Sequence, residues 1–253
     1  MPPSPVTLAL AGFRAMRFVL HLLYGAMLAS VFPFLSIRYQ KRVLRRWSAE
    51  LLGIFNVRIS TAGAVSLQNV THGMIVANHI SWLDVIVLNA VLPLRFVAKA
   101  EVRHWPVIGW LCVRAQTLFI ERGKRSDTAR TNRLIAESLQ RGSCMALFPE
   151  GTTTDGSHVH HFHASLLQPA IDAHTHIYPV AIRYHDKDDK HTQDAAYIGD
   201  MTFIESLWKI LCSRDLNARL IATPAIDTQT DNRRALAQEA HHRITLALFT
   251  KIS

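Results

Sequence analysis

The feature that most constrains the fold is a short apolar strand that leads directly into an apolar helix. Residues 73–77 (GMIVA) carry no charge, are partly β-branched and begin with glycine, which predicts a buried strand. Ser81 is a favourable N-cap for an apolar helix that we expect to end before Pro93. In α/β proteins, ligands bind at the carboxyl ends of such strands. The turn between the strand and the helix is therefore a candidate functional site.

The same alternation of strands and helices continues along the chain. Further strands are expected at residues 53–60, 94–99, 117–120, 144–148, 177–182 and in a segment that reaches Leu220. Helices are expected at residues 38–52, 126–141, 202–213 and 231–249, with a short apolar helix after residues 105–109. Pro179 indicates that its strand lies at a sheet edge or has an irregular ladder. Together these segments predict an α/β layered fold with a central sheet.

An uncharged apolar segment lies near the N-terminus. Residues 18–35 (FVLHLLYGAMLASVFPFL) approach the roughly 20 apolar residues that a membrane-spanning helix needs. Three structures fit this segment: a spanning helix, a helix pair that enters one leaflet and breaks at Pro33, or an ordinary core helix. We favour membrane attachment, with the spanning and monotopic forms both open. The chain is accordingly divided into a membrane-anchoring helical segment, residues 1–37, and a second domain, residues 38–253.

The charge distribution supports membrane attachment. The formal net charge of +9 favours contact with polyanions such as nucleic acid, anionic lipid or phosphorylated substrates. Basic residues flank the apolar segment on both sides, with the larger group after it: Arg14, Arg17, Arg38, Lys41, Arg42, Arg45 and Arg46. Such flanks favour an anionic membrane surface over nucleic acid. The basic residues that follow the apolar segment are the larger group, and they predict that the second domain lies on the cytoplasmic face of the inner membrane.

Cysteine and histidine usage indicates neither a disulfide framework nor a metal centre. The three cysteines are far apart in apolar surroundings, as expected of reduced thiols in the cytosol: Cys112, Cys144 and Cys212. Residues 158–163 (HVHHFH) contain imidazoles, which are good zinc ligands. No cysteine or second cluster completes a tetrahedral site, so we interpret these histidines as solvated loop residues.

His79 and Asp84 lie five residues apart, in the turn that follows residues 73–77. A neutral imidazole removes a proton from a hydroxyl when one ring nitrogen is free and the other is held by an acceptor. Asp84 is placed to be that acceptor, which gives the base and the orienting carboxylate of a catalytic triad. No protein nucleophile stands beside the pair, so the substrate would supply the hydroxyl. The alternative is a capping box, in which Asp84 only accepts a backbone N–H and His79 is a polar surface residue.

Two further strand ends carry polar side chains. Arg122 follows an apolar strand, and its guanidinium could grip a phosphate or a carboxylate through two hydrogen bonds. A solvated basic loop fits Arg122 equally well. Glu150, Gly151 and Thr152 place a carboxylate, a permissive backbone and a hydroxyl in one turn, which suits a polar headgroup. Each of these two patterns is weak by itself.

Taken in order, four blocks of this sequence resemble the glycerolipid acyltransferase family, which includes the bacterial 1-acylglycerol-3-phosphate O-acyltransferases. The blocks are N-H-x4-D at Asn78, His79 and Asp84, F-x-x-R at Phe119–Arg122, F-P-E-G-T at Phe148–Thr152, and a strand with a proline at Tyr178–Val180. Intervening family features are matched by Lys99, Glu101, Pro106 and Gly109. The resemblance covers residues 38–183 closely, and the N-terminal membrane segment is also typical of the family.

The resemblance implies a central mixed sheet flanked by helices, and it also implies a reaction. His79 is expected to be the general base that deprotonates a lysolipid hydroxyl, and Asp84 is expected to orient it. The headgroup of the acceptor is expected to be held by Arg122, Glu150, Gly151 and Thr152. The hydroxyl attacks the thioester of acyl-CoA or acyl carrier protein. The expected partners are these substrates and membrane lipid, without a metal, another cofactor or nucleic acid.

One departure from the family pattern bears on the acceptor. Members that form phosphatidic acid usually carry arginine after E-G-T, where this chain has Thr153. Loss of a buried guanidinium contact would remove roughly 1.5–3 kcal/mol of binding energy. A related branch, which acylates lyso-ornithine lipid, resembles the E-G-T-T-x-D-G run of this chain. We therefore rank 1-acylglycerol-3-phosphate first, lyso-ornithine lipid second, and a noncatalytic protein that binds anionic lipid last.

Overall fold

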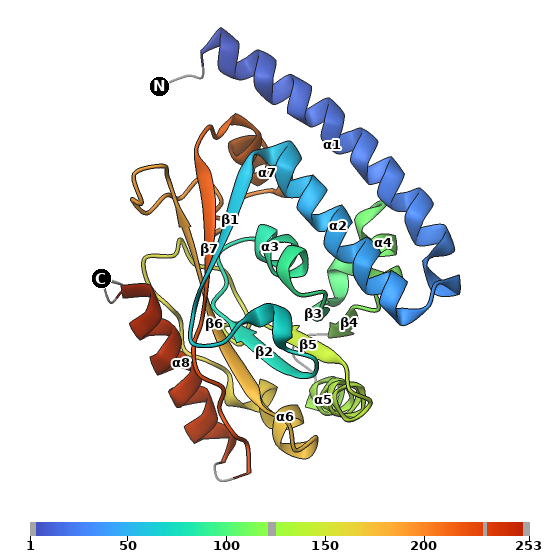
Figure 1. The fold of residues 1–253 in the computed structure, drawn as a ribbon, viewed down its shortest axis with the longest axis vertical. Helices are drawn as coiled ribbons and strands as arrows, with labels where there is room; N and C mark the ends of the chain where they lie inside the picture. The colour runs from blue at the N-terminus through green and yellow to red at the C-terminus, as the bar shows by residue number, and fades with distance from the viewer. Residues whose placement is uncertain (1–3, 121–124, 230–231, 250–253) are drawn as a thin grey trace.

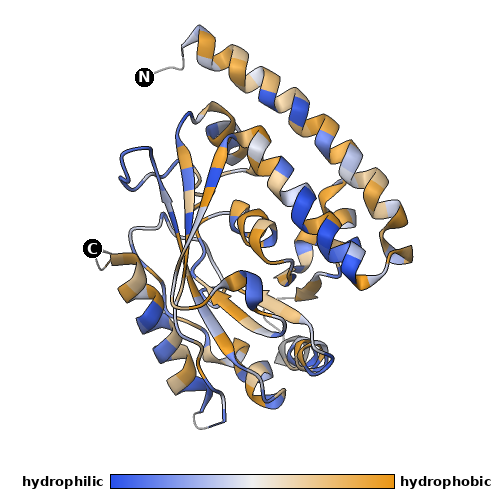
Figure 2. Cartoon of the chain, in the orientation of Figure 1, coloured by the Kyte–Doolittle hydropathy of each residue, from blue (hydrophilic) through white to orange (hydrophobic). Residues whose placement is uncertain are grey.

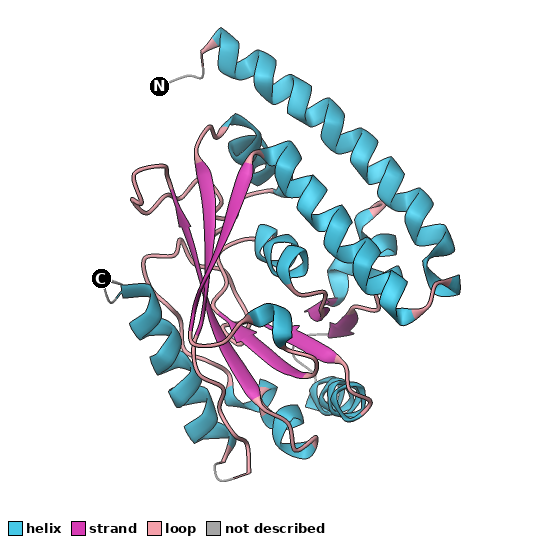
Figure 3. Cartoon of the chain, viewed as in Figure 1, coloured by secondary structure: helices cyan, strands magenta, loops and turns pink. Residues whose placement is uncertain are grey.

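A seven-stranded sheet with helices on both faces forms the centre of the molecule (Figure 1, Figure 3). The computed structural model describes residues 4–120, 125–229 and 232–249. The strand order is β1-β7-β6-β2-β5-β3-β4. The bounds are β1 Val57–Gly63, β2 Gly73–Ala77, β3 Arg95–Lys99, β4 Leu118–Ile120, β5 Cys144–Leu147, β6 Ile177–His185 and β7 Leu216–Ala222. Neighbouring strands are parallel except β6 and β7, so the predicted mixed α/β sheet is confirmed.

Helices cover both faces of the sheet because its central strands are apolar on both faces. In β2, Ile75 and Ala77 pack into one core, while Met74 and Val76 pack into the other. The first core includes residues of α1 (Pro5–Val31), α2 (Ile37–Phe55), α3 (Leu83–Val91) and α7 (Phe203–Cys212). The second includes residues of α5 (Arg125–Gln140), α6 (Gln168–Asp172) and α8 (Arg233–Phe249). The short helix α4 (Ile108–Arg114) connects β3 to β4.

The first strand begins later than predicted. It was expected from residue 53, but α2 continues to Phe55 and buries Ile54 and Phe55 as helical residues. Asn56 then ends the helix in the left-handed region, at φ 57°, and β1 begins at Val57. A short apolar run fits the end of a buried helix as well as a strand, which is why the boundary was misplaced.

Pro179 lies in an internal strand, so the predicted sheet-edge position is wrong. β6 is hydrogen-bonded to β2 on one side and to β7 on the other. The antiparallel ladder with β7 begins at Val180, and the carbonyl of Pro179 accepts the backbone N–H of Thr223 just before it. The alternative prediction of an irregular ladder is confirmed. Proline fits at the end of a ladder because it has no backbone N–H to donate.

The N-terminal apolar segment forms a longer helix than predicted. α1 begins at Pro5 and is followed by a 3-10 turn, Phe32–Phe34, that contains Pro33. The chain then turns into α2, and α1 packs along α2, α7 and α4 (Figure 1). The segment Pro5–Phe34 is long and apolar enough to cross a membrane. The division into a membrane anchor, residues 1–37, and a catalytic domain stays a prediction.

α1 has a packed face and an exposed face. Residues at intervals of three or four are buried against the body: Thr7, Ala11, Arg14, Phe18, His21, Gly25 and Ala29. A Cβ at Gly25 would lie 2.6 Å from the ring of Trp47, so this close approach requires glycine. Exposed apolar side chains include Val6, Phe13, Met16, Val19, Leu20, Leu23 and Met27. Figure 2 shows apolar residues along the whole length of this outer helix.

Candidate active site

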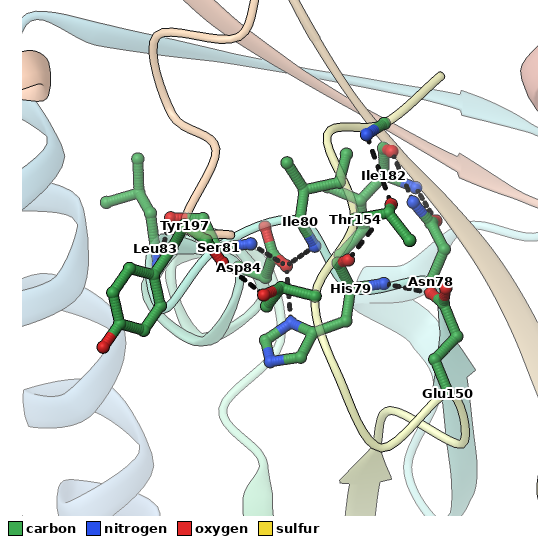
Figure 4. A network of polar contacts seen from close by, with 12 residues as sticks. Asn78, His79, Ile80, Ser81, Leu83, Asp84, Glu150, Thr154, Ile182 and Tyr197 are labelled. Carbon is green, nitrogen blue, oxygen red and sulfur yellow. Dashed lines mark hydrogen bonds and ion pairs between the residues drawn. The ribbon is translucent and has the colours of Figure 1, made fainter. Parts of the chain in front are cut away.

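Two turns meet at the carboxyl ends of neighbouring parallel strands. β2 and β5 are paired in parallel, so the turns that follow Ala77 and Leu147 leave the same edge of the sheet. The first turn contains His79 and Asp84, and the second contains Glu150. Figure 4 shows these three side chains in one network of polar contacts. His79 therefore lies at the carboxyl end of a buried strand, where the sequence placed it.

Asp84 is the centre of the first turn. Its side chain is buried, and its oxygen Oδ2 accepts a hydrogen bond from His79 Nδ1 at 2.8 Å. The same oxygen accepts the backbone N–H groups of Ile80 at 2.7 Å and Ser81 at 2.9 Å. The other oxygen, Oδ1, accepts the hydroxyl of Tyr184 at 2.8 Å. Backbone capping and the contact to His79 therefore coexist on one carboxylate.

The helix after this turn starts slightly later than predicted. α3 begins at Leu83, and the hydroxyl of Ser81 accepts the backbone N–H of Leu83 at 3.2 Å. Ser81 thus satisfies a free donor at the start of the helix from two residues away. The N-cap position itself is Trp82, one residue later than predicted, and the Trp82 side chain makes no capping hydrogen bond.

The imidazole of His79 is held so that one ring nitrogen stays available. An ionised carboxylate only accepts hydrogen bonds, so Nδ1 carries the proton and Nε2 of the neutral ring has a free lone pair. The ring lies on that of Phe148, with centroids 4.0 Å apart and an interplanar angle of 7°. The His79 side chain is 21% exposed. Nε2 is therefore an accessible proton acceptor in a fixed orientation.

Backbone contacts from three segments hold the first turn. The side-chain amide of Asn78 donates to the carbonyl of Ile182 at 3.0 Å and accepts its N–H at 2.7 Å, which joins the turn to β6. The carbonyl of His79 accepts the backbone N–H of Thr154 at 2.9 Å, and the next carbonyl accepts that of Tyr197 at 3.0 Å. Since these partners come from distant parts of the chain, the turn is fixed by the whole fold.

Glu150 joins the two turns. Its oxygen Oε1 accepts the backbone N–H of His79 at 2.6 Å, and Oε2 accepts that of His160 at 2.7 Å. The side chain is only 3% exposed. This burial raises the pKa of Glu150 to about 7; the two backbone donors oppose the shift, and the charge of Asp84 adds to it. Both oxygens face backbone N–H groups, so the contacts of Glu150 support the turns.

The other residues predicted to hold a headgroup lie beside Glu150 or outside the described part of the chain. Gly151 has φ 66°, a left-handed conformation that favours glycine. Thr152 is exposed on the turn. The hydroxyl of Thr153 donates a hydrogen bond to the carbonyl of Tyr197. Arg122 lies outside the described residues. The role of these residues in headgroup binding stays a prediction.

Tyr184 is a site residue that was not predicted from the sequence. It lies a hundred residues after Asp84, so no local spacing connects the two. The predicted strand ended at residue 182, whereas β6 continues to His185. The strand period of two places Tyr184 on the same face as Ile182, and a longer strand assignment would have pointed to it.

The histidine tract at residues 158–163 lies beside the second turn. Four of its side chains are exposed: His158, His160, His161 and His163. In the part of the chain that the structure describes, no group of three or more His, Cys, Asp or Glu side chains could hold a metal ion. The tract meets the site through the backbone N–H that His160 gives to Glu150.

Known proteins with similar sequences are acyltransferases. The family model described as Acyltransferase matches residues 58–183. The lyso-ornithine lipid O-acyltransferase of Pseudomonas aeruginosa is 37% identical over 210 residues, which cover 83% of this chain and 80% of that protein. The 1-acyl-sn-glycerol-3-phosphate acyltransferase of Neisseria meningitidis is 37% identical over 172 residues, which cover 68% of this chain and 67% of that protein.

The fold also matches a solved structure. The crystal structure of the 1-acyl-sn-glycerophosphate (LPA) acyltransferase, PlsC, from Thermotoga maritima matches with a TM-score of 0.64 and 20% sequence identity. The match covers 95% of this chain and 99% of that chain. At this level of identity the likeness concerns the fold, and it includes the N-terminal helices as well as the sheet.

Proposed function

This chain belongs to the acyltransferase family, and on that premise we propose that it transfers an acyl group from a thioester to the free hydroxyl of a lysolipid. The observation that carries the proposal is the His79–Asp84 pair, in which the carboxylate holds Nδ1 at 2.8 Å and Nε2 is free to accept a proton. Such a pair is a base without its own nucleophile, which suits a reaction in which the substrate supplies the hydroxyl.

In the proposed step, His79 Nε2 removes the proton of the acceptor's hydroxyl while the oxygen attacks the carbonyl carbon of the thioester. A new C–O bond forms and gives a tetrahedral intermediate, which collapses when the C–S bond breaks. The leaving thiolate takes the proton from the protonated imidazole, so the products are an ester and a free thiol. Asp84 stabilises the imidazolium between the two proton transfers. The donor is acyl-CoA or acyl carrier protein, and the step needs no metal or other cofactor.

Lyso-ornithine lipid is the acceptor that we place first, ahead of 1-acylglycerol-3-phosphate. The Pseudomonas relative, which is named for lyso-ornithine lipid, aligns with more of this chain than the Neisseria relative, which is named for 1-acyl-sn-glycerol-3-phosphate. Thr153 supports the same order, because its hydroxyl is turned to the carbonyl of Tyr197 and brings no positive charge to a phosphate. This order reverses the one expected from the sequence.

The acceptor's headgroup is proposed to lie over the second turn. Thr152 is exposed there and offers a hydroxyl, and Gly151 leaves the backbone accessible. The resemblance assigns Arg122 to headgroup binding as well, and Arg122 is proposed as the cationic side chain that binds the headgroup. Glu150 contributes indirectly in this proposal, since its two oxygens already bind backbone N–H groups.

The attachment to the membrane is proposed to be monotopic, with α1 lying along the bilayer surface. Arg14 donates to the carbonyls of Leu211 and Ser213 at 2.9 and 2.6 Å, and is itself buried. His21 Nε2 bonds the carbonyl of Trp47 at 3.0 Å, and the Trp47 indole donates to the carbonyl of His21 at 3.3 Å. A helix that crossed the bilayer would lose these contacts and place Arg14 in hydrocarbon, which is costly.

Charge on the neighbouring helix supports a cytoplasmic orientation in this proposal. Five basic side chains of α2 are exposed: Arg38, Lys41, Arg42, Arg45 and Arg46. Such a cluster beside an apolar helix favours the anionic lipid of the cytoplasmic leaflet. The apolar face of α1 would then enter the leaflet, while the acidic headgroups contact α2.

Purified wild-type and His79→Ala proteins in mixed micelles test the reaction. Acyl transfer from acyl-CoA and from acyl carrier protein is measured with lyso-ornithine lipid, 1-acylglycerol-3-phosphate and other lysophospholipids. We expect His79→Ala to lose about 10²- to 10⁴-fold in rate, the contribution of a general base. His161→Ala, which removes an exposed imidazole of the nearby tract, is the matched control and should keep the wild-type rate.

Equal rates for His79→Ala and the wild type would disprove the assignment of His79 as the base. If the wild type consumes no thioester with any lysolipid of the panel, the proposed reaction itself is wrong. A preference for 1-acylglycerol-3-phosphate over lyso-ornithine lipid would leave the reaction in place and restore the order of acceptors expected from the sequence.

A further inference from the structure

Tyr184 makes a hydrogen bond that connects the centre of the sheet to the candidate base. Its side chain is fully buried, and its hydroxyl lies 2.8 Å from Asp84 Oδ1. Tyr184 belongs to β6, whose pairing with β2 ends where Ala77 meets Val180. β6 continues past this point to His185, so its last residues extend beyond β2, where the chain turns towards the site.

Two contacts tie this extension of β6 to the His79 turn. The amide of Asn78 pairs with the backbone of Ile182, and the carboxylate of Asp84 accepts the hydroxyl of Tyr184. Ile182 and Tyr184 are two residues apart and lie on the same face of the strand. The turn is therefore attached to the sheet at its beginning and at its end.

The donors around Asp84 differ in where they come from. Oδ2 accepts His79 Nδ1 and the backbone N–H groups of Ile80 and Ser81, all of which belong to the turn itself. Among the described residues, Tyr184 is the donor that comes from outside the turn, and it binds the opposite oxygen. Together with the two backbone donors on Oδ2, it fixes the rotation of the carboxylate, because Oδ1 is bonded to the sheet while Oδ2 faces His79.

The hydroxyl of Tyr184 stays a neutral donor in this position. Burial, together with the charge of Asp84 and the hydrogen bond to it, raises the pKa of Tyr184 well above its usual value. Hydrogen bonds to an ionised acceptor are roughly twice as strong as those between neutral groups. The contact thus combines a fixed geometry with a stable protonation state.

We propose that Tyr184 is a positioning residue of the acyl transfer, which holds the Asp84 carboxylate in the orientation that presents Oδ2 to His79. The proposal rests on the proposed role of His79 as the base. Without the hydroxyl, Oδ1 would be a buried acceptor that has lost its donor. The carboxylate would then be held less well for proton transfer, which lowers kcat. One donor fewer would share its negative charge, so it would stabilise the imidazolium more strongly.

Tyr184→Phe removes the hydroxyl and keeps the ring. We expect kcat to fall about tenfold, the effect of a lost hydrogen bond to a charged group, while KM for both substrates changes by less than about twofold. The acidic limb of the kcat profile should move to higher pH, because a carboxylate with fewer donors stabilises the protonated imidazole more strongly. Glu150, the other carboxylate that faces this network, is the same in both proteins.

Tyr178→Phe is the matched control. Tyr178 lies on the same strand and the same face of β6, six residues earlier, and packs in the same core without contacting Asp84. It should keep the wild-type kcat and pH profile. The double variant with Asp84→Asn adds a second measurement, since loss of the hydroxyl should cost little further once the carboxylate is gone.

Unchanged kcat and an unmoved acidic limb in Tyr184→Phe would overturn the proposal. A lower kcat with an unmoved limb and a lower unfolding midpoint would also overturn it, because that result indicates a structural role only. The two proposals fail in different ways. Activity of His79→Ala refutes the proposed function, whereas an inactive His79→Ala beside a fully active Tyr184→Phe refutes the positioning role alone.

Discussion

The two turns at the active edge of the sheet each bury one carboxylate, but they surround it with different donors. Asp84 accepts four hydrogen bonds, two of them from the side chains of His79 and Tyr184. Glu150 accepts two, both from backbone N–H groups, and burial raises its pKa to about 7. Burial alone therefore does not give a carboxylate a role in proton transfer. Asp84 is bonded to an imidazole with a free nitrogen, whereas Glu150 holds the backbone of both turns in place.

The Asp84→Asn variant is expected to have the largest effect, and it tests whether the carboxylate of the first turn is needed for the reaction. The amide keeps the shape of the carboxylate, but it has no charge, and its NH2 group cannot accept the hydrogen bonds that Asp84 accepts. The corresponding change in a serine-protease triad lowers kcat by about 10⁴-fold. We expect a loss of about 10³- to 10⁴-fold here, measured by steady-state kinetics with the thioester donor.

Asp172→Asn is the matched control for this prediction. Asp172 is the last residue of α6 and accepts a hydrogen bond from Gln168 at 2.8 Å. The kcat of this control variant should stay within about threefold of the wild-type value, since the replaced carboxylate does not contact the imidazole. An Asp84→Asn protein with kcat within about tenfold of the wild type would show that His79 works without its carboxylate.

Glu150→Gln tests the second turn through the pH dependence of stability. A pKa raised from 4.5 to about 7 means that the folded protein keeps a proton that the unfolded chain has already released. This contribution to stability is fully present below the unfolded pKa of 4.5 and is lost as the pH rises through 7. The free energy of unfolding of the wild type, relative to Glu150→Gln, should fall by up to about 3 kcal/mol over this interval. Urea unfolding in detergent, followed by tryptophan fluorescence, measures the difference at each pH.

Glu137→Gln is the control for the same pH series. Glu137 is a half-exposed residue of α5 that pairs with Arg141 at 3.3 Å, and its replacement shows how the stability difference varies with pH when a carboxyl group outside the site is removed. A flat difference for Glu150→Gln would contradict the prediction. It would mean that the two backbone donors outweigh the burial of the carboxylate and keep it ionised as in the unfolded chain.

The first turn could be predicted from the sequence because its main partners are close along the chain. His79 and Asp84 are five residues apart, and the apolar run before them predicts the buried strand that ends at the site. Tyr184 could not be predicted in this way, because its contact with Asp84 depends on the register of β6 against β2. Glu150 was predicted as a site residue, but its contacts could not be, because its donors come from His79 and from the loop that follows the second turn.

The N-terminal helix shows a different limit of prediction. Arg14 and Arg17 interrupt the apolar pattern, so the predicted segment started at Phe18, whereas α1 starts at Pro5. Arg14 is nevertheless buried in the packed face of α1, because carbonyls at the end of α7 accept its hydrogen bonds. A charged residue is tolerated in such a place only with partners, and those partners lie about 200 residues further along the chain.

Ser81→Ala is expected to have the smallest effect, and it separates helix capping from catalysis within the first turn. The hydroxyl of Ser81 accepts the backbone N–H of Leu83 at 3.2 Å, whereas the contact with Asp84 is made by the backbone N–H of Ser81, which alanine retains. We expect the free energy of unfolding to fall by about 1 kcal/mol. The value of kcat should stay within about threefold of the wild type, and both quantities are measured on one preparation. A loss of kcat beyond about tenfold at unchanged stability would assign the hydroxyl to the reaction. Ser81 would then act on the substrate together with His79. In that case the first turn could no longer be divided into an orienting carboxylate, Asp84, and a hydroxyl that only stabilises the helix, Ser81.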